Sequence, residues 1–138
     1  MAIASYLIAA SGAIFLLLGA GHLLLTYLGQ LLSPRDATLR AHMRQSYPVI
    51  TRETTMWSAW QGFNASHSLG AMFFGAVYLD LALAHVTWLA QDRVLQVVGV
   101  AAVLGWVLLA FRHWFLAPQV GLTMAALLYA AGLFAMHA

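Results

Sequence analysis

The strongest constraint in this sequence is the placement of its charged side chains. Four long stretches contain no Asp, Glu, Lys or Arg: residues 1–34, 54–79, 94–111 and 113–138. A bilayer core about 30 Å thick is crossed by roughly 20 helical residues. In lipid the backbone must satisfy its own hydrogen bonds, and these apolar runs do not alternate as barrel strands do. We therefore predict an all-α membrane protein, with four transmembrane helices in an antiparallel bundle.

The composition excludes several other classes of protein. Of the 138 residues 63% are apolar and only 7% are charged, whereas a soluble domain is about 25% charged. So few charges cannot cover a water-facing surface. Six arginines against four acids form no basic patch, so nucleic acid is not an expected partner. The absence of Cys excludes disulfides and metal–thiolate sites, and we predict no metal site.

We expect a single transmembrane domain over residues 1–138. Its helices are predicted at about residues 3–29, 55–79, 94–112 and 117–136. The last connection is short, so the third and fourth helices should be antiparallel neighbours, turned at Pro118.

The loop at about 30–54 is the only sizeable segment outside the predicted spans. Within it Leu39, Met43 and Tyr47 recur at four-residue spacing among arginines. This pattern predicts a short amphipathic segment on the membrane surface, where Arg side chains attract anionic lipid headgroups. The lipid bilayer is thus the first expected partner.

Two helix starts are predicted in this loop from side chains that cap helices. Ser33 is the expected N-cap of the amphipathic segment, with Pro34 at its first helical position. Thr51 is the expected cap of the second transmembrane helix. That assignment would place Glu53 in the first turn, where the helix dipole favours a negative charge.

The distribution of arginine predicts the orientation of the chain. The first and third loops share one side of the membrane and hold five arginines, whereas the second loop holds one. The five are Arg35, Arg40, Arg44, Arg52 and Arg112. Because cytoplasmic loops carry the excess of positive charge, we expect loops one and three in the cytoplasm and both termini outside.

The second transmembrane helix has two unusual faces. Plotted at 100° per residue, its polar and Trp side chains fall within an arc of about 120°. These are Glu53, Trp57, Trp60, Gln61, Asn64, His67 and Ser68. A separate ridge is formed by Gly62, Ser66 and Gly70, at a spacing that lets another helix backbone approach closely. This helix is therefore expected to pack against two neighbours.

The first helix carries one polar stripe, which includes His22 and Thr26. Gly12 and Gly19 on the same helix indicate close approach to a neighbour. His67 of the second helix is placed near the membrane midplane. His22 lies either level with it or displaced by a turn, because an error of two to four residues in a helix end moves a side chain by about 3–6 Å.

Polar groups inside a membrane raise a functional hypothesis, and three interpretations stay open. In the first, His22, Gln61, Asn64 and His67 bond to one another and hold helices together in a non-enzymatic protein. That protein would be an accessory or structural subunit that packs with other membrane-protein subunits or with itself. In the second, these residues bind a cofactor, with imidazole or amide contacts to haem, quinone or chlorin. The third is a small membrane enzyme that acts on a lipid.

The sequence contains none of the common catalytic motifs, so no catalytic residue is assigned. There is no HExxH, no Gly-rich phosphate loop and no GxSxG. This absence favours the non-enzymatic interpretation.

Two segments resemble a family of small, uncharacterised bacterial four-helix membrane proteins. The segments read GAGHLLLTYLGQLLSPRD and PVITRETTMWSAWQGFNASHSLGAMFFG, and they cover about half of the chain. The resemblance rests on His22, the Pro-Arg-Asp run at 34–36, and the TRxTTMW and GFNASHSLG runs of the second helix. It implies the four-helix topology and a bacterial membrane, but no reaction. We expect that membrane to be the inner, cytoplasmic membrane.

Overall fold

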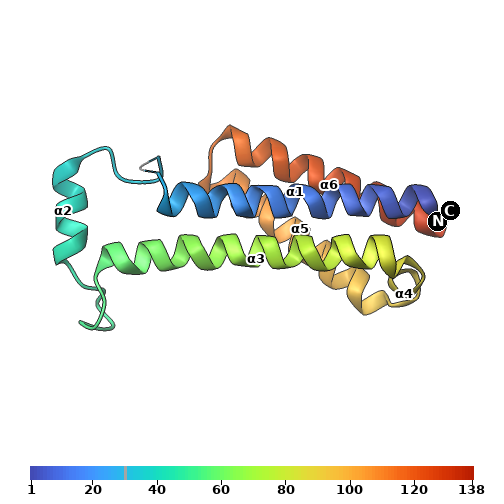
Figure 1. The fold of residues 1–138 in the computed structure, drawn as a ribbon, viewed down its shortest axis with the longest axis horizontal. Helices are drawn as coiled ribbons and strands as arrows, with labels where there is room; N and C mark the ends of the chain where they lie inside the picture. The colour runs from blue at the N-terminus through green and yellow to red at the C-terminus, as the bar shows by residue number, and fades with distance from the viewer. Residues whose placement is uncertain (30) are drawn as a thin grey trace. The chain divides into compact units, whose positions relative to one another are not determined.

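The computed structural model describes residues 1–29 and 31–138 and shows six α-helices in them (Figure 1). They are α1 (Ala2–Tyr27), α2 (Ala37–Gln45), α3 (Met56–Ala84), α4 (Val86–Gln91), α5 (Arg93–His113) and α6 (Leu116–His137). No strand occurs in this part of the chain. Residue 30, where the predicted loop begins, lies outside the described residues.

Four of the helices confirm the predicted fold class. Helices α1, α3, α5 and α6 are each long and apolar enough to cross a membrane. The described chain forms two compact units, which we call the first unit (residues 1–18 and 71–138) and the second unit (residues 19–70). The first unit contains parts of all four long helices. Because four helices can each cross a membrane, the protein is an all-α, multi-pass membrane protein.

Two glycines bring α1 and α3 into backbone contact in the first unit. A Cβ on Gly12 would lie 2.8 Å from the Gly75 carbonyl oxygen, and a Cβ on Gly75 would lie 2.5 Å from that of Gly12. Real Cβ atoms do not approach so closely, so only glycine fits at these two positions. The close approach that Gly12 predicts is therefore confirmed, and its partner is Gly75.

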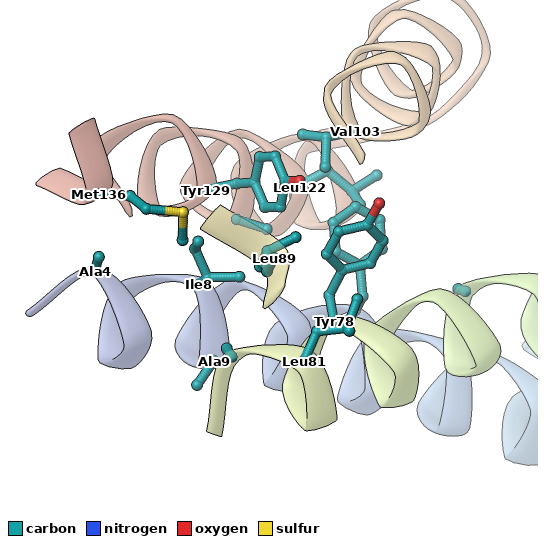
Figure 2. Packing of buried hydrophobic residues seen from close by; sticks show 14 of the residues in the cluster. Ala4, Ile8, Ala9, Tyr78, Leu81, Leu89, Val103, Leu122, Tyr129 and Met136 are labelled. Carbon is teal, nitrogen blue, oxygen red and sulfur yellow. The ribbon is translucent and has the colours of Figure 1, made fainter. Parts of the chain in front are cut away.

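Aromatic rings fill the core of the first unit. The Phe15 ring contacts Phe74 and Trp106 edge-on, at centroid distances of 4.7 and 6.0 Å. Tyr78 and Tyr129 form a further edge-to-face pair, 5.5 Å apart, among the buried side chains of Figure 2. Such pairs add about 0.5–1.5 kcal/mol beyond the area that they bury. Aromatic packing therefore connects all four long helices.

Side-chain hydroxyls also join the helices of the first unit. Ser11 Oγ on α1 donates to the Ala125 carbonyl oxygen on α6 at 2.8 Å, and Ser5 Oγ donates to the Ala82 carbonyl on α3. Tyr78 on α3 donates to the Leu95 carbonyl on α5 at 2.6 Å. Each bond supplies a hydroxyl with the partner that lipid cannot offer.

The structure corrects both predicted helix caps in the loop. The amphipathic helix α2 begins after Asp36, whose Oδ1 accepts from the Thr38 backbone N–H at 2.8 Å, and not after Ser33. Helix α3 begins after Thr55, whose hydroxyl accepts from the Ser58 N–H at 3.2 Å. Thr51 instead closes a turn within the loop by accepting from the Glu53 N–H. Glu53 therefore lies outside α3 and does not belong to its polar arc.

The connections of the first unit also differ from the prediction. Helix α3 runs to Ala84 instead of ending near residue 79, so Asp80 lies within the helix, where its side chain is 66% exposed and 3.8 Å from the His85 ring. The short helix α4 was not predicted. Helices α5 and α6 pack together, as expected, but the turn lies at 114–115. Pro118 sits in the first turn of α6, where its missing N–H is not required.

We predict that Gly75→Ala lowers the stability of the folded protein strongly. Its new Cβ would lie 2.5–2.6 Å from backbone atoms of α1, which cannot yield as a side-chain end would. Overpacking of this kind costs about 1–3 kcal/mol or more. The measurement is the free energy of unfolding in mixed micelles.

The matched control is Gly105→Ala on α5, because a Cβ there meets nothing within 4 Å. It should leave the free energy of unfolding unchanged or slightly raised. Equal losses in the two variants would show that the contact between Gly12 and Gly75 is not what holds α1 against α3.

Candidate functional site

Two histidines and an asparagine form a cluster in the second unit. The His22 ring of α1 and the His67 ring of α3 are in edge-to-face contact, with centroids 5.4 Å apart and planes at 66°. His22 Nε2 lies 2.9 Å from Asn64 Oδ1. The structure therefore brings the His22 ring within reach of both Asn64 and His67. We call His22, Asn64 and His67 the polar cluster.

The hydrogen bonds of Asn64 determine which nitrogen of His22 carries the proton. Asn64 Nδ2 donates to the Trp60 carbonyl oxygen, one turn earlier on α3, at 2.8 Å. Because the amide nitrogen is used there, the amide oxygen faces His22 and accepts from it. Neutral His22 is therefore the Nε2–H tautomer. Its Nδ1 keeps the lone pair, which is the part of an imidazole that accepts a hydrogen bond or binds a metal.

The hydroxyls beside the polar cluster bond to their own helices. Thr26 Oγ1 donates to the His22 carbonyl oxygen, and Ser68 Oγ donates to the Asn64 carbonyl oxygen, each at 2.8 Å. Both side chains are buried, Ser68 completely. Bonds of this type satisfy the hydroxyl but do not connect two helices. Among the described residues of this unit, the polar contacts that join α1 to α3 are those of the polar cluster.

The rest of the predicted polar arc does not join the cluster. Gln61 is half-buried, and among the described residues its side chain makes no hydrogen bond. Trp57 and Trp60 stack on each other, with centroids 5.4 Å apart and planes at 18°. The Arg44 guanidinium of α2 lies over the Trp57 ring, 5.4 Å from its centroid.

The cluster provides few options for binding a metal or a haem. The described residues contain no group of three or more His, Cys, Asp and Glu side chains that could hold a metal ion. The two imidazoles touch, so a haem between them would require the rings to separate. In the arrangement shown, the residues hydrogen-bond and pack; the cluster contains no carboxylate and no hydroxyl nucleophile.

The sequence interpretation missed two contributors to this region. One is the Trp60 carbonyl, which orients Asn64; the four-residue spacing from Trp60 to Asn64 is the pattern that could have indicated it. The other is Arg44 of α2, which contacts Trp57 of α3 thirteen positions later in the chain. No periodicity within one helix indicates a contact of that kind.

Within the second unit, the first position of the small-residue ridge of α3 is open. A Cβ on Gly62 would meet nothing within 4 Å, and Ser66 and Gly70 are exposed. The Ser66 hydroxyl donates to the Phe63 carbonyl of its own helix at 3.0 Å. The prediction that α3 packs against two neighbours is met in the first unit, where α3 contacts α1 at Gly12 and Gly75 and bonds to α5 through Tyr78. That the ridge at 62–70 receives a second helix stays a prediction.

The chain matches no protein-family model, no curated protein and no solved structure. The function must therefore be argued from the contacts of its own residues.

We predict a measurable coupling between His22 and Asn64. In a double-mutant cycle of His22→Ala and Asn64→Ala, we expect an interaction free energy of about 0.6 kcal/mol and at most about 1.7 kcal/mol, the range for interhelical hydrogen bonds in membranes. The measurement is the free energy of unfolding of the two single variants, the double variant and the parent protein.

Ser66→Ala serves as the control partner in a second cycle with His22→Ala. Its hydroxyl bonds only within α3, so the coupling with His22 should be zero within error. A vanishing coupling between His22 and Asn64 would contradict the hydrogen bond as a link between α1 and α3.

Proposed function

We propose that this protein is a non-enzymatic, multi-pass subunit that packs within a larger membrane assembly or homo-oligomer. The proposal rests on one observation: the ridge of Gly62, Ser66 and Gly70 is exposed over two turns of α3. We call this ridge the small-residue face. At the pair of Gly12 and Gly75, the same kind of residue brings two helix backbones into contact. The small-residue face has the composition for such a contact, and within the second unit its Gly62 position is open.

The physics of helix association in lipid supports this use of the small-residue face. Lipid tails are as apolar as Leu side chains, so helices associate in membranes through close packing and interhelical hydrogen bonds. A face without large side chains permits the closest approach. Ser66 adds a hydroxyl that now bonds within its own helix and is available to a partner helix.

The polar cluster has a supporting role in this proposal. By joining α1 to α3 through His22 and Asn64, it holds the first half of α3 in a defined position. The Gly62 face of the same helix is then presented as a rigid surface. Preorganisation of this kind lowers the entropy that a partner must overcome on binding.

We further propose that the protein lies in a bacterial inner membrane, with both termini outside and loops one and three in the cytoplasm. The support is that five arginines lie in or next to loops one and three, whereas only Arg93 lies next to loop two. The resemblance of the second-helix motifs to bacterial four-helix proteins adds to it.

The assembly proposal predicts crosslinking at Ser66. The chain has no native Cys, so Ser66→Cys introduces a single thiol on the small-residue face. Oxidation in native membranes should give a disulfide-linked dimer if the partner is a second copy. A bifunctional thiol–amine reagent should instead give a larger adduct if the partner is another subunit. Gly62→Leu in the same chain should abolish either product while the free energy of unfolding stays unchanged, because the position is open.

The control for this experiment is Gly105→Cys on α5, a second open position in a spanning helix. It should give no product, since nothing indicates a contact there. Absence of any product from Ser66→Cys, or equal products from both positions, would overturn the proposed interface.

The orientation proposal predicts the activity of reporters fused to the C-terminus. Alkaline phosphatase needs disulfides and gains activity only outside the cytoplasm. We expect that alkaline phosphatase fused after Ala138 is active and that green fluorescent protein fused there is not fluorescent. The opposite pair of results would reverse the assigned topology.

A further inference from the structure

A hydrogen bond holds the end of α2 against the start of α3. The Met56 backbone N–H donates to the Ser46 carbonyl oxygen at 2.9 Å, and Ser46 is the C-cap of α2. The chain between them is thereby closed into a loop, which we call the tip loop (residues 46–56). Helix α3 begins at Met56 and is long and apolar enough to cross a membrane, so the tip loop and the end of α2 lie just beyond one end of a candidate span. Figure 1 shows α2 lying across the direction of the neighbouring part of α3.

The tip loop contains a turn whose corners are apolar. The Thr51 backbone N–H donates to the Pro48 carbonyl oxygen at 3.3 Å, which is the bond of a β-turn over residues 48–51. The two corner residues are Val49 and Ile50, whose exposed fractions are 109% and 93%. Gly, Asn, Asp and Ser dominate turn corners in water. Two adjacent β-branched apolar residues at full exposure are therefore unusual for a turn in water and fit an apolar surface outside the protein.

Positive charge surrounds this apolar turn. Segment 35–53 contains four arginines and two acids, a net charge of +2 when His42 is neutral. Asp36 is engaged as the cap of α2. The Arg44 guanidinium rests on the Trp57 ring in the first turn of α3, and Arg52 is exposed beside Ile50. Aromatic rings with cations above them are typical of the headgroup level of a bilayer.

We propose that the tip loop is a membrane anchor that binds anionic phospholipid. Val49 and Ile50 insert among the acyl chains of the leaflet that contains the start of α3, while Arg44 and Arg52 bind the phosphate groups of anionic lipids beside it. Charge complementarity selects this occupant: an anionic headgroup layer is attracted by the arginines, and the acyl chains beneath it bury the turn. This site is separate from the small-residue face and does not depend on the assembly proposal.

The test measures the depth of a spin label on the turn. Val49→Cys and Ile50→Cys, each labelled in the full-length protein, are reconstituted in nanodiscs of phosphatidylcholine alone or with phosphatidylglycerol. Relaxation by oxygen, which concentrates in the acyl region, is compared with relaxation by a water-soluble nickel complex. We expect both labels to be relaxed more by oxygen, and to move deeper when phosphatidylglycerol is present. A label at Gln45, which is exposed and polar, should be relaxed more by the nickel complex than by oxygen in both lipids.

Charge variants separate the headgroup contact from the insertion. Arg44→Gln together with Arg52→Gln should abolish the shift that phosphatidylglycerol causes. Arg93→Gln, an exposed arginine at the start of α5, is the control and should leave the shift intact.

Three outcomes would overturn the proposal. The first is nickel-accessible labels in both lipids, which would place the turn in water. The second is a depth that does not respond to phosphatidylglycerol, or a response that survives loss of both arginines. The third is labels that are water-exposed in nanodiscs but shielded from both reagents in native membranes, which would identify a protein as the occupant.

Discussion

The structure depends on one constraint: inside a membrane, a polar atom must find its partner in the protein. Buried Ser11, Thr26 and Ser68 all donate to backbone carbonyls, and Ser11 does so across two helices. His22 and Asn64 satisfy each other. Among the described residues, the hydroxyls of Thr123 and Tyr129 are buried exceptions. Polar side chains are therefore few, and most of those inside the spans act as links or as local caps.

The same constraint explains how far the sequence alone predicts the fold. A charge inside lipid is so unfavourable that ten charged residues were enough to locate four spans. Helix ends follow weaker preferences. Ser33 and Asp36 both have oxygens that cap a helix, as do Thr51 and Thr55, and each choice is worth only about 1 kcal/mol. In the structure the caps are Asp36 and Thr55, so the path of the loop determines which oxygen of each pair lies at the helix start.

The candidate site was predictable in its members but not in its contacts. The sequence places His22, Asn64 and His67 on facing stripes of two helices, because a helix repeats every 3.6 residues. Whether the rings meet depends on the relative depth of the helices, which shifts by 1.5 Å for each residue of error in a helix end. The contact between Arg44 and Trp57 depends on the path of the loop between α2 and α3. The sequence of a loop has no regular repeat, so it does not predict that path.

Glycine spacing shows most clearly what a membrane sequence encodes. Gly12, Gly75 and Gly62 each remove a side chain from a helix surface, yet the first two meet a backbone and the third meets nothing within 4 Å. A small residue therefore encodes the capacity for close approach and leaves the partner unspecified. Under the assembly proposal, the partner of Gly62 is a helix within the bilayer, because the chain has little mass outside its candidate spans. The apolar turn at Val49 and Ile50 likewise has a surface without a partner in the chain's second unit. In our proposal its partner is lipid, because the turn is apolar and the arginines near it are positively charged.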